Sequence, residues 1–511
     1  MQSLAQSGGA AGRDETLARL AHERFDVLAI GGGIVGAGTA ALAARHGLRV
    51  ALLERADFAS GSSSASSKLI HGGLRYLRMG DFRLVREALH EGTVLKRTVA
   101  PQLVHDLDFV LPVYHGGPYG RGAIGAALAL YSLLGGHARG RGRFVPAARA
   151  QALVPALNGA GLRGVGLYAD AQTNDARLCL ANVRSAADAG AAAANRVEVV
   201  GIERRGDETR VAARDLRTGA ALEVAARTVV NASGAAVDEV RRLEDPQAGA
   251  SVSLSKGAHL VLERPPGWRA ALTIPIDRER VSFAIPWEGL LLLGTTDSAF
   301  DPERDTLAVT AGEEAQILAE AGRVLPPEVL RPEAIRARFA GLRVLPLTAG
   351  ATAEARREVV LTRGPLGVVS VAGGKLTTYR AIAISVLREL RADLGLREVD
   401  RTPFPLPGAA DPRPVAAGLR RDFPALEPER AQHLACAYGS LAAEVLASGS
   451  LEPLAPGALD VEAQAVYALE REWALDADDV LRRRTTLALR GLDTPELRER
   501  LARLADERIQ A

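Results

Sequence analysis

The sequence predicts a mixed α/β fold, because three apolar segments typical of buried strands each run into a glycine-rich turn. These turns hold Gly31, Gly234 and Gly373, and they follow residues 25–30, 228–231 and 368–371. In a doubly wound sheet such turns meet at the carboxyl edge of the strands, where ligands bind. The alternative is three unrelated turns, which would form no common site. We therefore expect a Rossmann-type domain at the front of the chain.

The first turn carries the strongest local motif. A predicted strand over residues 25–30 leads into Gly31-Gly-Gly-Ile-Val-Gly36, then a helix over about 34–45 and a second strand that ends at Glu54. In this pattern Gly31 makes the tight turn, Gly33 lets the backbone approach a pyrophosphate, and Gly36 lets the helix lie close to the strand. The helix dipole favours the phosphates, and the Glu54 carboxylate can accept both ribose hydroxyls of an adenosine. The unit predicts a bound dinucleotide, either FAD or NAD.

Further elements follow in order along the chain. Up to residue 170 we expect a polar loop at 57–68, a helix at 82–99 and strands at 107–114 and 163–169. A helix that Asn174 or Asp175 could cap begins at 174, and a β-meander follows at 197–230. Beyond it we expect strands at 258–262, 281–285, 290–294, 359–362 and 368–371, and helices at 311–323 and from the Gly373 turn to about 394. Residues 401–414 are rich in proline and predict a linker, and only helical periodicity follows from residue 415.

Composition narrows the class of protein. A chain of 511 residues with 47% hydrophobic and 24% charged residues is long enough for two or three ordinary globular domains. The net charge of +2 indicates neither nucleic acid nor a strongly acidic partner. Cys179 and Cys436 form no CxxC, and the histidines show no metal-binding spacing, so we expect no disulfide framework, no metal site and a reducing compartment.

Membrane and targeting signals are weak. Residues 1–22 lack the apolar core of a secretory signal, and we expect residues 1–24 to form a flexible N-terminal segment. No apolar run reaches the roughly 18–20 residues that span a bilayer. The most apolar stretch, residues 123–134, is flanked by Arg121 and Arg143 and has two interpretations. It is either a buried helix with solvated arginines or a surface helix that rests on anionic lipid.

Long motifs spread over the chain resemble those of one enzyme family. The longest is Asp57-Phe-Ala-Ser-Gly-Ser-Ser-Ser-Ala-Ser-Ser-Lys-Leu-Ile-His-Gly-Gly-Leu-Arg-Tyr-Leu77. Shorter ones follow in the same order at 175–178, 231–234, 255–259, 294–297, 341–343, 373–380 and 472–485. Together they closely resemble the FAD-dependent (aerobic, respiratory) glycerol-3-phosphate dehydrogenase family over essentially the whole chain after residue 24. Asn174, where the family often has an acid, and Ala235-Ala236, in place of proline–tryptophan, depart from it.

The resemblance implies an architecture. A Rossmann-type FAD-binding domain (25–100, 165–240 and 345–398) would be interleaved with an antiparallel β-rich substrate domain (101–164 and 241–344). A linker over 399–414 and a C-terminal α-helical domain over 415–511 would follow. Arg482-Arg-Arg484 would then lie on a solvated helix face or at a domain interface.

The same resemblance implies a reaction and its residues. The family oxidises sn-glycerol 3-phosphate to dihydroxyacetone phosphate by hydride transfer to flavin N5 and passes the electrons to a membrane quinone. A phosphate dianion needs fixed cations, and the C2 hydroxyl needs a base and a cation that favours the forming alkoxide. The family motifs place Arg75, Tyr76 and Arg363 on the substrate phosphate, although Tyr76 could equally be a packing residue. They place His259, Arg343 and Lys375 at the catalytic centre, where His259 and Arg343 compete for the role at the C2 oxygen.

Residues for the FAD cofactor follow from the motifs in the same way, and His71 is assigned to flavin contact rather than to proton abstraction. The expected set is Gly31, Gly33, Gly36, Glu54, Ser66, Ser67, Lys68, His71, Gly72, Gly234, Gly373, Gly374, Leu376 and Thr377.

Two other functions stay open. One is a glycerol-3-phosphate oxidase, which would reoxidise its flavin with oxygen on the same fold. The other is a non-catalytic flavin-binding protein, against which the joint presence of His259, Arg343, Arg363 and Lys375 argues. With a quinone acceptor we expect a cytoplasmic protein in peripheral contact with the inner face of the cell membrane. A homodimer is one option for its assembly.

Overall fold

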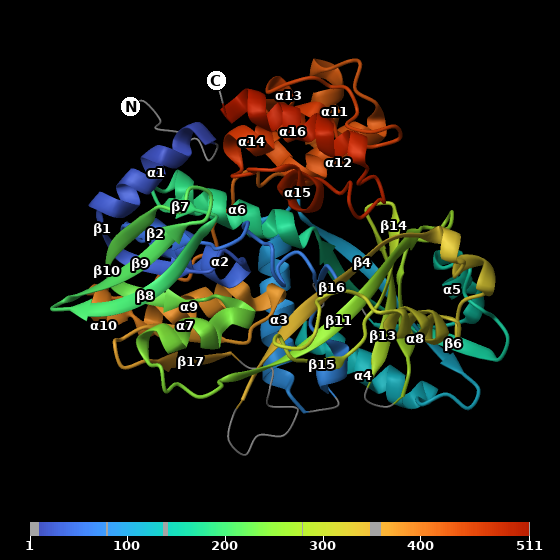
Figure 1. Ribbon diagram of the computed structural model, residues 1–511. Helices are drawn as coiled ribbons and strands as arrows, with labels where there is room; N and C mark the ends of the chain where they lie inside the picture. Colours follow the sequence, from blue (N-terminus) through green and yellow to red (C-terminus); the bar gives the residue numbers. More distant parts are fainter. Residues whose placement is uncertain (1–9, 78–79, 136–141, 278–279, 348–358, 510–511) are drawn as a thin grey trace.

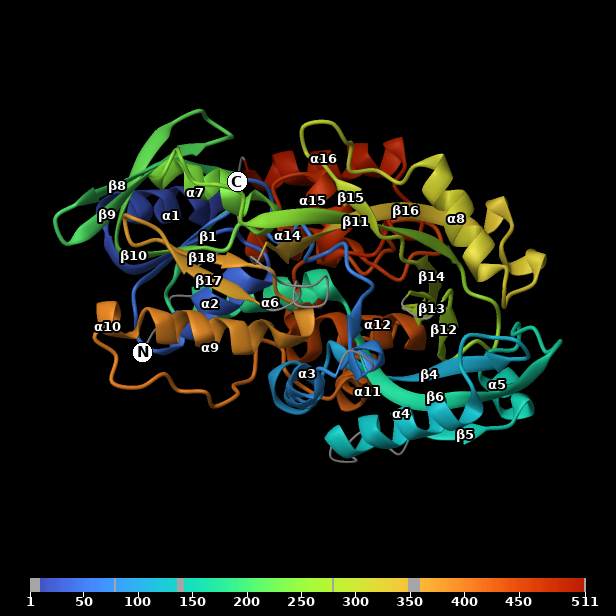
Figure 2. The same ribbon diagram turned by 90° about the horizontal axis from the view of Figure 1, so that it is seen from below.

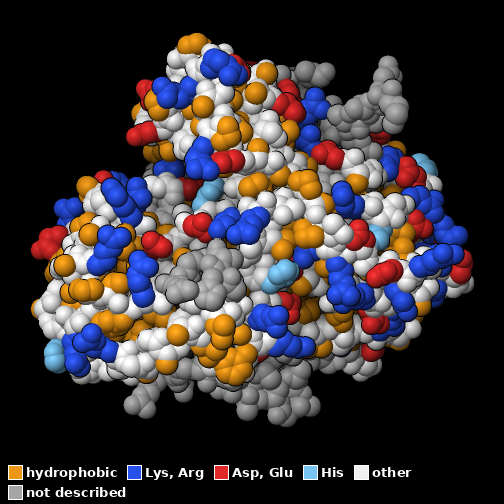
Figure 3. Space-filling view, turned by 180° about the vertical axis from the view of Figure 1, so that it is seen from behind, with side chains coloured by type: hydrophobic (Ala, Val, Ile, Leu, Met, Phe, Trp, Pro, Cys, Tyr) orange, Lys and Arg blue, Asp and Glu red, His pale blue; other side chains and the backbone are white. Residues whose placement is uncertain are grey.

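The computed structural model describes residues 10–77, 80–135, 142–277, 280–347 and 359–509. Two lobes built around β-sheets lie side by side, and a helical domain sits above them (Figure 1). Seen from below, the long strands β11 (Val252–Glu263) and β16 (Ile335–Pro346) run along the junction between the two lobes (Figure 2). Basic and acidic side chains are interspersed over the back of the molecule, in keeping with a net charge near zero (Figure 3).

The first sheet forms the Rossmann-type lobe. Its strand order is β17 (Val360–Arg363), β18 (Val369–Ala372), β10 (Ala221–Asn231), β1 (Arg24–Ile30), β2 (Val50–Leu53) and β7 (Ala192–Ala194). All neighbours in this order are parallel except β17, which runs antiparallel to β18. The central strands are apolar on both sides, as a parallel sheet covered on both faces requires. This confirms the predicted fold class.

Different elements cover the two faces of this sheet. Helices α2 (Ile34–Arg45), α6 (Asp175–Asp188) and α9 (Tyr379–Glu389) share one hydrophobic core with it. The other face packs against α1 (Ala10–His22), α7 (Val237–Glu244) and the antiparallel strands β8 (Val197–Arg205) and β9 (Glu208–Asp215). The predicted helix at 34–45 and the predicted β-meander at 197–230 are therefore confirmed.

Helix α1 corrects the expectation of a flexible segment at residues 1–24, of which residues 1–9 lie outside the described residues. Leu20 is fully buried against the first sheet, and Arg13 forms a buried ion pair of 2.8 Å with Asp215. Buried Leu20 and the Arg13–Asp215 ion pair fix this helix. Nothing in the local sequence indicates the ion pair, because Asp215 lies 202 residues away.

The second sheet forms the other lobe. Its order is β15 (Ser298–Phe300), β11, β14 (Leu290–Gly294), β13 (Val281–Trp287), β12 (Ala271–Pro275), β4 (Val104–Tyr114), β6 (Leu162–Thr173) and β3 (Leu69–Ile70), while β16 pairs with β11 and β5 (Arg143–Val145) with β6. Most pairs are antiparallel, and β12 with β4 is parallel. Strands β3 and β6 belong here, although residues 25–100 and 165–240 were expected in the FAD part. The domain boundaries remain predictions.

Helices cover both faces of the second sheet. Alternate residues of β4 point to opposite sides: Phe109 packs with α3 (Phe82–Val94) and α4 (Arg121–Leu134), whereas Val110 packs with α5 (Ala147–Leu153) and α8 (Ala311–Ala321). Helix α4 buries Ile124, Leu128 and Tyr131 and leaves Leu133 exposed. Within the described ranges, no helix combines the length and apolarity needed to cross a bilayer.

The C-terminal domain is helical, as expected. It consists of α11 (Pro412–Asp422), α12 (Pro428–Tyr438), α13 (Ala442–Ala447), α14 (Glu462–Arg471), α15 (Ala477–Asp479), the π-helical turn η9 (Val480–Arg484) and α16 (Pro495–Ile509). Proline opens three of these helices, where its missing N–H has no intrahelical partner to lose. Residues 401–411 hold no helix or strand, and α11 begins at Pro412, so the linker ends before the predicted residue 414.

Candidate active site

The first glycine-rich turn is too tight for side chains. Gly31 has φ of +104°, and a Cβ there would lie 2.6 Å from the Ala232 carbonyl oxygen. A Cβ on Gly36 would lie only 1.9 Å from the Gly31 oxygen, which explains the close approach of α2 to the turn. Gly33 is the N-cap of α2 and has no side chain, which leaves room for an anion at the helix end, where the Ile34 N–H is bonded to Ser63 Oγ. These features fit the pyrophosphate of a dinucleotide.

The second and third turns lie next to the first. Ala232, which precedes Gly234 by two residues, donates its N–H to the Ile30 oxygen at 2.8 Å. Gly374 has φ of +112°, and a Cβ there would lie 3.7 Å from Val35 of α2. Gly373 and Gly234 also adopt positive φ, at +84° and +61°. The three turns therefore meet at one edge of the first sheet, as the sequence predicted.

Glu54 braces the first turn. Its carboxylate accepts hydrogen bonds of 2.7 Å from the N–H groups of Gly32 and Ala56. Burial raises the pKa of Glu54, and these two backbone donors oppose that shift. The contact with a ribose stays a prediction.

A polar segment that we name the serine loop, residues 57–68, joins the two lobes. Ser63 Oγ accepts from the Ile34 N–H at 2.8 Å, and Ser62 Oγ donates to the Leu342 oxygen of β16 at 2.6 Å. A Cβ on Gly341 would lie 2.3 Å from the Ala65 oxygen, so β16 can approach the loop only with glycine there. The loop thus links the dinucleotide turn to the second sheet.

Ser66 and Lys68 direct their side chains to a partner within the protein. Ser66 Oγ and Lys68 Nζ lie 2.7 and 2.6 Å from the two carboxylate oxygens of Asp175, the first residue of α6. The Lys68–Asp175 ion pair is buried, and the Lys68 ammonium also lies 5.0 Å from the centre of the Trp287 ring. These contacts hold the end of the serine loop, and the contact of either residue with FAD stays a prediction.

His259 on β11 faces this loop. Its Nε2 lies 2.9 Å from Ser67 Oγ, and its ring stacks on Phe339 of β16 at 4.7 Å between centroids. Burial, followed by the positive charges of Arg343 and Lys68, lowers the pKa of His259 to about 3. The imidazole is therefore uncharged at neutral pH.

Arg343 lies opposite Ser255 in the β11–β16 pair. It donates to Thr295 Oγ1 at 2.7 Å and to the Thr296 oxygen at 3.0 Å. A Cβ at position 257 would lie 2.5 Å from the Arg343 Nη2, so Gly257 makes room for the guanidinium. The preceding residue of the same turn, Gly294, pairs with His259 in the sheet. Arg343 and His259 are thus held on the two sides of one turn, which places a fixed cation close to an uncharged imidazole.

The segment around His71 lies against the third glycine turn. The His71 N–H donates to Thr377 Oγ1 at 3.3 Å, within the short helix η7 (Leu376–Thr378). The Gly72 N–H donates to Asp170 at 3.3 Å, and a Cβ at Gly72 would lie 2.5 Å from the Tyr131 hydroxyl. Lys375 is half-buried directly before η7. Its catalytic role stays a prediction, as do the FAD contacts of Leu376 and Thr377.

One of the predicted phosphate residues, Arg363, lies away from the third glycine turn. Arg363 stands opposite Val369, at the start of β18, whereas the glycine turn follows the end of that strand. Its guanidinium bonds Asp393 at 2.8 Å and the Glu389 oxygen at 3.1 Å on the molecular surface. This corrects the prediction that Arg363 binds substrate: β17 runs antiparallel to β18 and so carries it away from the site. The side chains of Arg75 and Tyr76 lie outside the described residues.

Comparisons with known proteins agree with this geometry. A family model described as FAD dependent oxidoreductase matches residues 26–380, and one described as the C-terminal domain of alpha-glycerophosphate oxidase matches residues 402–510. The chain is 37% identical to glycerol-3-phosphate dehydrogenase 2 of Mycobacterium tuberculosis, over 95% of this chain and 85% of that protein. It is 36% identical to glycerol-3-phosphate dehydrogenase of Synechocystis sp., over 91% and 89% of the two chains.

A solved structure matches over nearly the full length. It is the glycerol-3-phosphate dehydrogenase from Bacillus halodurans complexed with FAD, with a TM-score of 0.75, 26% identity and 98% coverage of both chains. Fold, site and matches together define an FAD-dependent oxidoreductase. Within that class the chain belongs to the FAD-dependent glycerol-3-phosphate dehydrogenase family, and FAD is its cofactor.

Proposed function

We propose that this protein oxidises sn-glycerol 3-phosphate to dihydroxyacetone phosphate and passes the electrons to a quinone. The names of its relatives in Mycobacterium tuberculosis and Synechocystis support the substrate. The observation that carries the proposal is the neutral His259 held beside the fixed Arg343 at the junction of the two lobes. An alcohol oxidation needs both, because a proton leaves the C2 oxygen while a hydride leaves the C2 carbon.

Each residue of the proposed site has its own part in this reaction. Bound FAD supplies the acceptor of the hydride from C2, at flavin N5. His259 takes the C2 hydroxyl proton at Nε2, the nitrogen that faces the serine loop and hence the FAD-binding lobe. Ser67 Oγ lies within hydrogen-bond distance of this nitrogen, and in the tautomer that carries its proton on Nδ1 the Nε2 accepts from the hydroxyl. Arg343 stabilises the negative charge that develops on the C2 oxygen, and Lys375 adds a second cation from the third glycine turn.

Arg75 and Tyr76 are the proposed phosphate partners. The placement of their short helix, η1 (Leu74–Leu77), supports them, because it follows His71 and Gly72 directly in the chain. An arginine in that position can bind a phosphate dianion through its two-pronged guanidinium.

The decisive experiment is anaerobic. The purified yellow holoenzyme is mixed with sn-glycerol 3-phosphate, and the oxidised flavin absorbance is followed. Bleaching with formation of dihydroxyacetone phosphate supports the proposal, and a stable yellow spectrum contradicts it and favours a non-catalytic flavin protein.

Oxygen is the alternative electron acceptor, since the C-terminal match is to a domain of an alpha-glycerophosphate oxidase. The reduced enzyme is mixed in parallel with a soluble quinone analogue and with oxygen. Faster reoxidation by the quinone supports a dehydrogenase, which would meet its quinone at the inner face of the cell membrane. Rapid reoxidation by oxygen with stoichiometric peroxide identifies an oxidase.

A further inference from the structure

Two buried arginines of the C-terminal domain reach into the FAD-binding lobe. Arg483 and Arg484 end the π-helical turn η9 and are 7% and 1% exposed. Both form ion pairs with Asp57, the first residue of the serine loop. Arg484 uses its second nitrogen as well, with Nη2 2.9 Å from Asp57 Oδ1. The expected domain interface at Arg482-Arg-Arg484 is thus found at two of its three residues, since Arg482 is exposed.

Asp57 is held ionised in the interior. Its side chain is fully buried, and Asn195 Nδ2 donates to it at 3.0 Å. Burial by itself would raise the pKa of Asp57, but the charges of Arg484 and Arg483 outweigh it and hold the pKa below its usual value. The carboxylate therefore depends on cations that another domain supplies.

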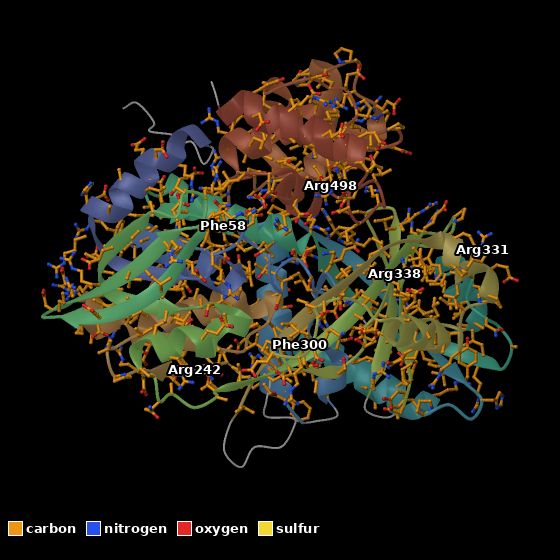
Figure 4. All side chains as sticks on the ribbon, viewed as in Figure 1. Phe58, Arg242, Phe300, Arg331, Arg338 and Arg498 are labelled. Atoms are coloured by element: carbon orange, nitrogen blue, oxygen red, sulfur yellow. The ribbon has the colours of Figure 1, made fainter. Side chains whose placement is uncertain are left out.

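Phe58, the residue after Asp57, packs between the dinucleotide turn and the C-terminal domain. A Cβ on Gly32 would lie 2.3 Å from Phe58 Cδ1, and the Ala59 N–H donates to the Gly32 oxygen at 3.0 Å. Trp473, at the base of the C-terminal domain, packs edge-on against Phe58 with 5.5 Å between ring centroids. Phe58 lies directly beneath the C-terminal domain (Figure 4). One side of the turn thus rests on residues that this domain fixes.

We propose that Arg483 and Arg484 are positioning residues for the FAD-binding turn, so that the C-terminal helical domain controls the retention of FAD. The chain of contacts runs from the two arginines to Asp57, then through Phe58 to Gly32. Loss of either arginine leaves the buried Asp57 carboxylate with one cation instead of two, and the serine loop must move to hydrate it. Movement of Phe58 and Ala59 breaks the packing and the hydrogen bond that hold Gly32 in the turn. The inference rests on the proposed placement of FAD at Gly31–Gly36.

A neighbouring ion pair provides a matched control. Arg177 of α6 makes two hydrogen bonds, of 2.6 and 2.7 Å, to Glu472 of the C-terminal domain. Both side chains are buried, at 8% and 9% exposure, across the same interface. The Glu472 carboxylate does not touch Asp57 or Phe58, and Arg484 meets Glu472 only at its backbone oxygen. Glu472→Gln keeps that backbone contact and removes one charge from the same interface.

The test follows FAD release from the holoenzyme. Arg484→Gln, Arg483→Gln, Glu472→Gln and the unaltered protein are purified yellow and diluted. Free flavin fluorescence then gives the release rate at a temperature where circular dichroism shows every protein folded. We expect at least ten-fold faster release from Arg484→Gln, a smaller increase from Arg483→Gln, and an unchanged rate from Glu472→Gln. Arg484→Lys, which keeps the charge but loses the two-pronged contact, should recover part of the effect.

Each outcome decides the proposal. Equal release rates in the arginine variants and the unaltered protein overturn it, as does an equal increase in Glu472→Gln, which would mean general domain loosening. If Arg484→Gln does not fold, Arg483→Gln carries the test, because Arg484 still neutralises Asp57. The result is independent of the proposed substrate: failure of sn-glycerol 3-phosphate to bleach the flavin would overturn the proposed reaction and leave these release rates intact.

Discussion

Ser67 Oγ lies 2.9 Å from His259 Nε2, although the two residues are 192 positions apart in the chain. The contact joins the serine loop, which supports the dinucleotide turn, to β11 of the second sheet. It fixes the orientation of a histidine whose ring stacks on Phe339 and lies near the positive charges of Arg343 and Lys68. The histidine that we propose as the base is thereby aligned by the lobe that binds the cofactor.

We predict that Ser67→Ala slows flavin reduction about 3- to 10-fold, the loss expected for one neutral hydrogen bond. Stopped-flow absorbance under anaerobic conditions measures the rate. Ser62→Ala is the matched control, because Ser62 bonds the Leu342 oxygen from the same loop and does not contact His259. Equal effects of the two substitutions would mean that the loop acts only as a structural element.

We predict that Arg343→Ala lowers the rate of flavin reduction by about 10²- to 10³-fold, the usual cost of removing a charge-stabilising donor at a developing oxyanion. The yellow holoenzyme should keep its FAD, since the side chain bonds Thr295 and Thr296 in the second sheet. The absorbance ratio of flavin to protein checks the second point. Loss of FAD in this variant would place Arg343 at the cofactor instead.

We predict that His259 makes the protein less stable in acid. The unfolded histidine has a pKa of 6.5 and the folded one about 3, so below pH 6.5 the unfolded state binds more protons. The free energy of unfolding is therefore unaffected by this histidine above pH 6.5. Between pH 6.5 and pH 3 it decreases, by about 2 kcal/mol at pH 5. Chemical denaturation at pH 7 and pH 5 should show a smaller decrease for His259→Gln than for the unaltered protein. An equal decrease in both would contradict the low pKa.

We predict that Arg363→Ala leaves the KM for sn-glycerol 3-phosphate unchanged within a factor of about two, because Arg363 pairs with Asp393 at the far end of β18. The stability loss should stay below about 1 kcal/mol, as is usual for half-exposed ion pairs. Steady-state kinetics and thermal unfolding measure both. A large rise in KM would restore the original substrate-binding role of this residue.

Much of the first lobe could be predicted from short stretches of sequence. The spacing of Gly31, Gly33 and Gly36 and the apolar strands beside them are local patterns, and the helix at 34–45 was found within those bounds. Strand β16 was missed, although it carries Arg343. Its residues are only partly buried, and the alternation of Ile335-Arg-Ala-Arg-Phe339 breaks off at Ala340-Gly341, so no single period covers the strand. The position of Arg363 was wrong because the sequence does not indicate the direction in which β17 runs.

The sequence by itself determined the α/β class, the dinucleotide turn, the helical C-terminal domain and the family, because these depend on residues close together or on long motifs. Only the tertiary structure decided which charges meet: Lys68 with Asp175, and Asp57 with Arg484, which is 427 residues away. An ion pair needs proximity in space, and any of the many arginines in this chain could serve an aspartate equally well in sequence terms. The packing of the two lobes and the C-terminal domain around the serine loop decides which partner each charge meets.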